Sequence, residues 1–216
     1  MNVFEVATLY KGYVDENDPS WHSDVIPTYL KLGYADFRKF VNTINPWVYG
    51  TSIDIDVNGY SYDLANAAIT ILGKSPTNTK LSRLLQVWTT QNNLLGSPLE
   101  ASLGPREQYT NNCTYRLENT VLHFSSSVTK RLRLFYIPQS TVNWSLLGSL
   151  DDEYIDDLDE HHELIAIYAA MRYGARDEGM PLILDLKGRK EQELNDHMFH
   201  FHGEAGNVIR SVADSF

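Results

Sequence analysis

The sequence predicts an α+β fold in which helices from both ends of the chain form a helical bundle and the middle forms an antiparallel β-sheet or β-sandwich lobe. Apolar residues recur every three or four positions in 26–41 and in 155–171, the period of an amphipathic helix. They alternate with polar residues in 52–57 and 131–136, the period of a half-buried strand. Because helical and strand periods occupy separate stretches, we expect the two kinds of element to segregate.

Length and composition set the size of these parts. The chain has 216 residues, of which 43% are hydrophobic, and this suits one domain or two small lobes sharing a core. We place the helical lobe at residues 1–45 and 150–216, and the β-rich lobe at residues 46–149.

Two helices are expected at the start of the chain. Residues 3–13 predict a short first helix. A longer helix follows Ser23, whose hydroxyl suits the N-cap position. Its apolar face consists of Ile26, Leu30, Tyr34, Phe37 and Val41. This helix should end near Asn45-Pro46, because the residue before a proline avoids the helical conformation.

A β-hairpin is predicted next. The alternating segment 52–57 is followed by Asn58-Gly59, the strongest short hairpin signal. Residues 60–64 are then expected to return as the second strand. Residues 65–79 are compatible with either a short helix or a buried strand.

The following stretch carries mixed signals. Residues 87–90 are β-formers, whereas Leu81, Leu84, Leu85 and Trp88 have helical spacing. Residues 91–112 contain Asn, Gly, Pro and Ser and are interpreted as a long loop, either functional or flexible.

Three more strands are expected before the chain returns to helix. Residues 114–117 and 121–124 form a pair joined by a turn at Glu118-Asn119. Residues 125–129 are interpreted as a second turn. The strand 131–136 then ends at Ile137-Pro138.

The last third predicts two helices. The acidic run 151–160 suits the start of a helix, whose dipole favours negative charge there. The helical face that follows consists of Ile155, Leu158, His162, Ile165, Ala169 and Arg172. Alanines at 166, 169 and 170 indicate close packing, and Gly179 and Pro181 mark the end. A final helix is expected over 182–201, and the tail after Gly203 is weakly specified.

Charge and cysteine content restrict the function classes. The formal net charge is −10, so a basic surface for nucleic acid is not the global design, although Lys130-Arg131-Leu132-Arg133 is a local basic patch. Acidity favours solubility and would repel DNA from a surface that DNA passes without sticking. The single cysteine, Cys113, allows no internal disulfide and fits a reducing cytoplasm. We also expect no signal peptide and no membrane span.

One histidine cluster is a candidate metal site. His197 and His200 lie three residues apart on the predicted last helix, and Asp196 precedes His200 by four. Two imidazoles and a carboxylate can hold a metal ion. The alternative is an exposed helix end, where a positively charged histidine is favoured, and it is the interpretation we prefer.

Other candidate chemistry is incomplete. His161-His162-Glu163 lacks the H-E-x-x-H zinc motif, because residue 166 is alanine. Asp54, Asp56, Asn58 and Gly59 match the first half of a Ca²⁺ loop, but Ala65 replaces the final glutamate. The acidic run resembles a solvated segment more than paired catalytic carboxylates, and Gly73-Lys74-Ser75 is only the end of a phosphate loop. We therefore expect no enzyme, with no catalytic, cofactor-binding or metal residue and no cofactor.

Several stretches together resemble the head-to-tail adaptor (tail tubular or connector) proteins of tailed bacteriophages. They are Trp21-His22-Ser23-Asp24 before the long helix, Tyr62-Asp63-Leu64, the strands from Tyr115 to Phe124 and Leu132 to Pro138, and the alanine-rich 164–170. The order of these elements covers most of the chain.

The resemblance implies a structural virion protein, assembled in the host cytoplasm. Subunits would form a closed ring with the twelvefold symmetry of the portal, the helical part would dock on the portal, and the β part would meet the tail nozzle or tube. The lumen would pass DNA without reading it, and no membrane would be contacted. The alternatives are another tail or baseplate protein, or a carbohydrate-binding or hydrolytic β-domain.

Overall fold

The protein is a mixed α+β chain that divides into two compact units. The computed structural model describes residues 1–14, 25–64, 81–91, 94–102, 113–140, 142–144, 155–173 and 180–213; for residues 81, 180, 181 and 200–213 only the backbone is described. Unit 1 contains Met1–Asn45 and Thr141–Phe216, and unit 2 contains Pro46–Ser140. The chain therefore re-enters the helical unit at Thr141, earlier than the residue 150 expected from sequence.

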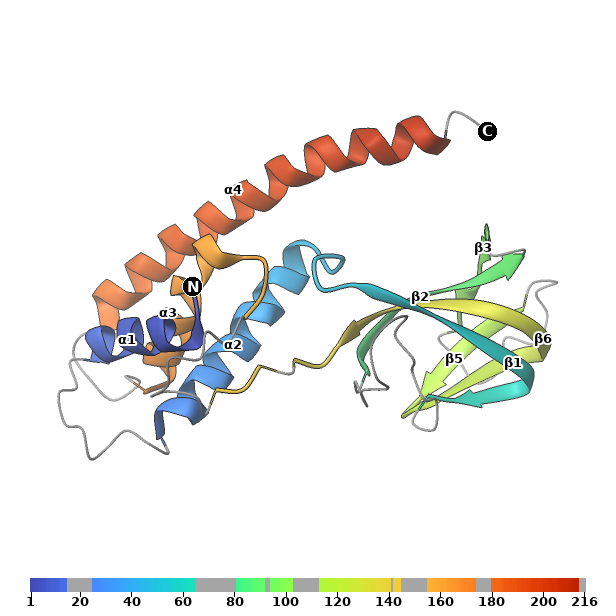
Figure 1. The fold of residues 1–216 in the computed structure, drawn as a ribbon, viewed down its shortest axis with the longest axis horizontal. Coiled ribbons are helices and arrows are strands. Elements are labelled where there is room, and N and C mark those ends of the chain that lie inside the picture. The colour runs from blue at the N-terminus through green and yellow to red at the C-terminus, as the bar shows by residue number, and fades with distance from the viewer. Residues whose placement is uncertain are drawn as a thin grey trace. The chain divides into compact units, whose positions relative to one another are not determined.

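Unit 1 is built around helix α3 (Glu163–Tyr173). Helices α1 (Val3–Val14), α2 (Val25–Ile44) and α4 (Met180–Ala213) each contact α3 (Figure 1). Every residue from Leu164 to Ala170 is buried, as the alanine-rich pattern predicted. The expected boundaries of the first two helices are confirmed, whereas Ser23 lies outside the described residues.

A capping box begins α1. The Asn2 side chain accepts a hydrogen bond from the Glu5 backbone N–H, and the Glu5 carboxylate accepts one from the Asn2 N–H, both at 2.9 Å. This reciprocal arrangement satisfies two backbone donors that a helix start otherwise leaves unpaired.

The prediction of one helix over 155–171 is wrong at its start. Residues 155–158 are not helical, a single 3-10 turn, η2, occupies Asp159–His161, and α3 begins at Glu163. The Asp156 carboxylate accepts the Leu158 backbone N–H at 2.9 Å. Aspartate side chains that bond nearby backbone in this way compete with the helix.

The end of the chain also differs from the prediction. The helix expected to end near Gly179 is described as far as Tyr173, and the residues that would test its end, 174–179, lie outside the described residues. Helix α4 begins at Met180, so Pro181 lies in its first turn, where a missing N–H costs little. The backbone of α4 continues to Ala213, well past the expected end at 201.

The described residues of unit 2 form a six-stranded sheet organised around β6 (Val121–Pro138). Strand β1 (Thr51–Asp63) pairs along one edge of β6. Strands β2 (Leu81–Gln91) and β5 (Thr114–Glu118) pair with the two ends of the other edge. The short strands β3 (Leu94–Pro98) and β4 (Glu100–Ala101) complete the curled sheet in Figure 1, with β4 parallel to β5 and all other pairs antiparallel.

The predicted hairpin at Asn58-Gly59 is wrong. Strand β1 continues through this dipeptide, and both its halves pair with β6, because β6 is long enough to serve both. Gly59 pairs with Val128 and Ser61 with His123, so the register shifts between them. Residues 125–129, predicted as a turn, belong instead to the continuous strand β6, and 125–127 lie in its irregular stretch. The local signals mark a bulge rather than a chain reversal.

The remaining strand predictions are partly correct. Segment 81–90 is a strand, which resolves its mixed pattern, and the turn after Glu118 is confirmed, with Asn119 at a positive φ of 53°. The predicted loop 91–112 is wrong where it contains β3 and β4. Residues 65–79 and 103–112 lie outside the described residues.

None of the helices within the described ranges combines the length and apolar composition that a bilayer span requires.

The core of unit 2 is formed by inward-facing residues of β1, β2, β5 and β6, with Val87, Leu122 and Leu132 fully buried. The polar residues that alternate with them lie on the outer face of the sheet.

Candidate functional site

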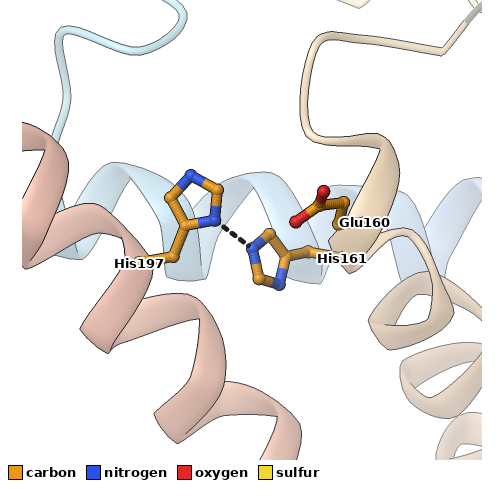
Figure 2. Close-up of side chains that lie close together, drawn as sticks. All are labelled: Glu160, His161 and His197. Carbon is orange, nitrogen blue, oxygen red and sulfur yellow. Dashed lines mark hydrogen bonds between the residues drawn. The ribbon is translucent and has the colours of Figure 1, made fainter.

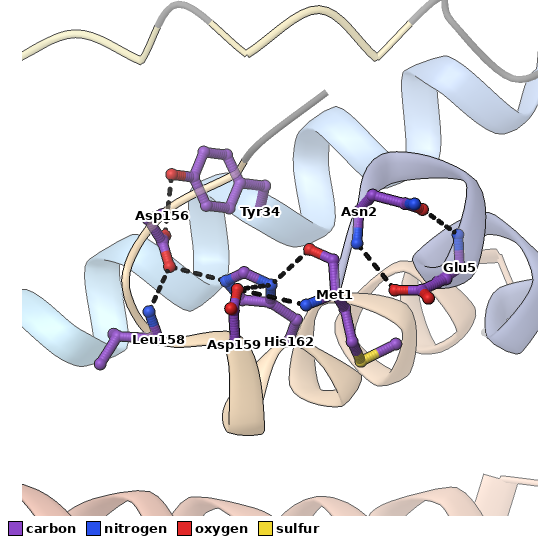
Figure 3. Close-up of polar contacts among 8 residues, drawn as sticks. All are labelled: Met1, Asn2, Glu5, Tyr34, Asp156, Leu158, Asp159 and His162. Carbon is purple, nitrogen blue, oxygen red and sulfur yellow. Dashed lines mark hydrogen bonds and ion pairs between the residues drawn. The ribbon is translucent and has the colours of Figure 1, made fainter. Parts of the chain in front are cut away.

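A polar cluster at the centre of unit 1 depends on Asp156 (Figure 3). Its carboxylate accepts hydrogen bonds from the Tyr34 hydroxyl at 3.0 Å and the Leu158 N–H at 2.9 Å, and pairs with His162 Nε2 at 2.6 Å. His162 is fully buried, and its Nδ1 faces the Met1 carbonyl at 3.2 Å. The two ring nitrogens therefore face oxygen atoms on opposite sides, the Asp156 carboxylate and the Met1 carbonyl.

The contacts of this cluster connect separate segments of unit 1. It joins the start of the chain, α2 and the segment before α3, and Phe37 packs edge-on against the His162 ring at 6.2 Å between centroids. The Asp156–His162 contact therefore fixes how these three segments meet inside unit 1. The prediction that 151–160 is a solvated segment is therefore wrong for Asp156, whose side chain is 11% exposed.

A second cluster brings together Glu160, His161 and His197 (Figure 2). His161 Nε2 lies 2.9 Å from His197 Nδ1, and the ligand atoms of all three residues lie within 4.8 Å of one another. Glu160 and His161 come from η2, and His197 comes from α4. Burial lowers the pKa of His161, and the neighbouring His197 lowers it further, so the neutral ring is favoured. Among the described residues of unit 1, the ligand atoms of these three side chains lie close enough together to hold a metal ion.

The sequence identified only part of this cluster. It singled out His197, but with Asp196 and His200 as its companions. In the structure Asp196 accepts a hydrogen bond from Gln192 at 2.7 Å, and the side chain of His200 is not described. His161 and His197 are 36 residues apart. No local spacing pattern could have paired them.

On the outer face of unit 2, the local basic patch lies opposite the segment that partly matches a Ca²⁺ loop. Arg133 makes two hydrogen bonds to Asp54 at 2.6 and 2.9 Å, and Arg131 makes two to Asp56 at 3.0 and 3.4 Å. Asn58 accepts a weaker one from Thr129 at 3.4 Å. The negative charges of the segment that partly matches a Ca²⁺ loop, on β1, are therefore neutralised by the arginines of the local basic patch, on β6.

We expect Asp54→Asn to lower stability by about 0.5–1 kcal/mol at neutral pH, because the Asp54–Arg133 pair is only partly exposed and bidentate. Hydrogen bonds from Arg133 lower the pKa of Asp54. This contribution is thus fully present above the unfolded-state pKa of about 3.9 and is lost as pH falls through the lower folded-state pKa. Urea unfolding of both proteins at neutral and acidic pH measures it.

Asp56→Asn is the matched control, since Asp56 is 76% exposed and solvent screens its pair with Arg131. Its effect should be the smaller of the two. A difference between wild type and Asp54→Asn that persists unchanged at acidic pH would contradict the assignment of stability to this ion pair.

The thiol of Cys113, the single cysteine, has no activating base among its contacts with the described residues. The Cys113 thiol is partly buried and lies 3.8 Å from the Thr114 carbonyl oxygen. Gly73-Lys74-Ser75 and Ala65 lie outside the described residues. Unit 2 has a shallow hollow of about 450 Å³ between β2 and β5, whose lining includes Arg83, Tyr115 and Asn119. The carbohydrate-binding alternative would use this hollow.

Comparison with models of known protein families found no family that matches this chain, and a search of the curated proteins found no significant match.

Proposed function

We propose that the protein is a structural virion component, the head-to-tail connector subunit of a tailed bacteriophage. In this proposal the helices of unit 1 act as a bundle that docks on the portal, and unit 2 is a sandwich-like lobe that meets the tail nozzle or tube. The subunits close into a ring, expected to have twelve members, through which DNA passes. The protein is assembled in the host cytoplasm and has no catalytic role.

The observation that carries the proposal is that both units expose large apolar side chains. A ring needs two different patches on each subunit that meet head to tail and close. Exposed apolar surface rimmed by polar residues is typical of such interfaces. One patch in each unit meets this description.

In unit 1 the patch is the beginning of α4. Leu182 is 80% exposed and Leu184 is 48% exposed, whereas Leu194 and Met198 are buried. The contacts that attach α4 to the rest of unit 1 concentrate further along, at Lys190, Glu191 and His197. With 34 residues, the helix is about 51 Å long, far longer than the 11-residue α3 that it packs against. Such a helix offers surface to a neighbouring subunit.

In unit 2 the patch is the edge strand β3. It ends the strand order β3-β2-β6-β5-β4, every residue in it is exposed, and it presents Leu94 at 72% and Leu95 at 48% exposure. An exposed apolar edge strand is an aggregation hazard unless another chain covers it. A neighbouring subunit or the tail protein would do so in the assembled virion.

Charge supports the DNA channel in this proposal. The net charge is −10, and the two arginines of the local basic patch are engaged by Asp54 and Asp56. A wall of this kind offers phosphates few counter-charges, so DNA would pass without being held.

Electron microscopy of the negatively stained protein, alone and mixed with the portal protein of the same phage, tests the proposal. We expect rings on the portal, with or without free rings. A protein that stays monomeric and never joins the portal would rule the connector function out. Binding to a tail or baseplate protein but not to the portal would favour that alternative instead.

We expect the double variant Leu94→Asp, Leu95→Asp to stop assembly while leaving the fold intact. Both side chains are exposed, so charging them costs little in the monomer but places two unpaired carboxylates in an interface. Light scattering coupled to size-exclusion chromatography of each protein mixed with the portal protein measures the assembly, and thermal unfolding of the protein alone measures the fold. Ser126→Asp, an exposed position on β6, is the matched control and should assemble normally.

A further inference from the structure

We propose that Glu160, His161 and His197 form a binding site for one first-row divalent transition-metal ion, with Zn²⁺ the best match to the ligands. The inference is independent of the connector proposal, because it concerns the internal architecture of unit 1. An ion at this place would fasten α4 to η2 and so to the centre of the helical unit.

The ligand atoms are already close to the required geometry. Metal–nitrogen bonds of about 2.0–2.1 Å at the tetrahedral angle place two imidazole nitrogens about 3.3–3.4 Å apart. His161 Nε2 and His197 Nδ1 lie 2.9 Å apart, so the two nitrogens need to separate by only about half an ångström. Figure 2 shows the Glu160 carboxylate beside the two rings, at the place of a third ligand.

The chemistry of the three ligands selects the class of ion. Two imidazoles and one carboxylate suit Zn²⁺ and its neighbours, whereas Ca²⁺ and Mg²⁺ take oxygen ligands. Only a neutral imidazole has a lone pair for a metal. His161 is 8% exposed, and its Nε2 faces the His197 ring at 2.9 Å. A water molecule would complete the coordination, as in other sites with three protein ligands.

The surrounding charges tolerate a cation. Lys190 on α4 acts on His161 as a nearby positive charge, and its ammonium pairs with Glu163 at 3.1 Å and Glu193 at 3.0 Å. Both Glu160 and Glu193 act on His161 as nearby negative charges. The added charge of the ion is therefore offset by carboxylates on both contributing elements.

Titration of the chelator-treated full-length protein with Zn²⁺ alone, followed by calorimetry, tests the inference. We expect one ion per chain and a higher unfolding temperature with Zn²⁺ present, because an ion that binds only the folded state stabilises it. Co²⁺ in place of Zn²⁺ should give a visible absorption spectrum that reports ligand number. No binding, or a heat signal without any rise in unfolding temperature, would overturn the inference.

Variants identify the ligands. His161→Gln and His197→Ala should each weaken Zn²⁺ binding more than about 100-fold, since losing even a residue that only orients a ligand costs about 10- to 100-fold. Glu160→Gln, at an exposed position, should also weaken binding, and it serves if a histidine variant does not fold by circular dichroism. His123→Ala, a histidine 42% exposed in unit 2, should bind as wild type.

His200→Ala distinguishes this site from the helix-spaced pair that the sequence suggests. We expect His200→Ala to keep wild-type affinity. If binding is instead lost in His200→Ala and kept in His161→Gln, the site lies along α4 alone and the inference is wrong. Equal loss in His123→Ala would show general surface binding and would overturn it as well.

Discussion

Replacing Gly33 with leucine is expected to unfold unit 1 or to destabilise it by at least about 4 kcal/mol, beyond the range of most single substitutions. Gly33 lies in α2 where that helix crosses α3. A Cβ atom at this position would lie 2.5 Å from the Ile165 carbonyl oxygen and 2.8 Å from the Ala169 nitrogen. These are backbone atoms of a buried helix, so the clash is relieved only if the two helices separate.

The alanine variant makes the test sharper. In an open helix position, Gly→Ala stabilises by about 0.5–1 kcal/mol. We expect Gly33→Ala to destabilise by about 1–3 kcal/mol instead, because overpacking outweighs the gain in helix propensity. Gly188→Ala in α4 is the matched control, since nothing lies within 4 Å of its added Cβ. It should be neutral or stabilising.

Urea unfolding followed by far-ultraviolet circular dichroism measures all three variants. Opposite signs for Gly33→Ala and Gly188→Ala are the expected result. Wild-type stability in Gly33→Leu would show that α2 and α3 do not approach each other as closely as the structure has them.

Asp156→Ala has the second largest expected effect, a loss of about 3–4 kcal/mol. The substitution removes the acceptor of Tyr34, Leu158 and His162 together, and it leaves the fully buried His162 ring without its 2.6 Å partner. Removing one member of a buried pair costs about 3–5 kcal/mol, because the other keeps its desolvation penalty. Denaturant unfolding measures the loss.

A double variant separates the energy of the Asp156–His162 contact from that of the surrounding packing. Asp156→Ala combined with His162→Leu should lose less than the sum of the two single variants, because the orphaned imidazole is then gone. The control is Asp185→Ala in α4, whose pair with Arg189 is 69% exposed on the carboxylate side. It should change stability by less than about 0.5 kcal/mol. An additive double variant would contradict direct coupling between Asp156 and His162.

Much of the local structure could be predicted from the sequence. The helical spacing of apolar residues from Ile26 to Val41 predicted α2 and its end before Pro46. The alternation from Arg131 to Tyr136 predicted the last part of β6. These elements bury one face against a core, and burial of one face imposes a period that a reader of the sequence can recognise. The mixed α+β class followed from the same periods.

Predictions from local sequence signals were wrong where a segment distant in the chain forms the contacts instead. Asn58-Gly59 has the composition of a hairpin turn, but β6 pairs with the chain on both sides of it. Residues 155–158 carry a helical apolar pattern, but Asp156 bonds Tyr34, which lies 122 residues away. In both places, contacts remote in sequence outweighed a local preference worth only about 1 kcal/mol.

The sequence by itself determined the types of its strongly periodic elements and the separation of helical from strand-rich segments, because these follow from period and composition. Only the tertiary structure decided which charged and imidazole groups meet. It brought His161 to His197, Asp156 to His162, and Arg131 and Arg133 to Asp56 and Asp54. Such pairs are set by how helices and strands cross in space, and chain spacing carries no record of that crossing.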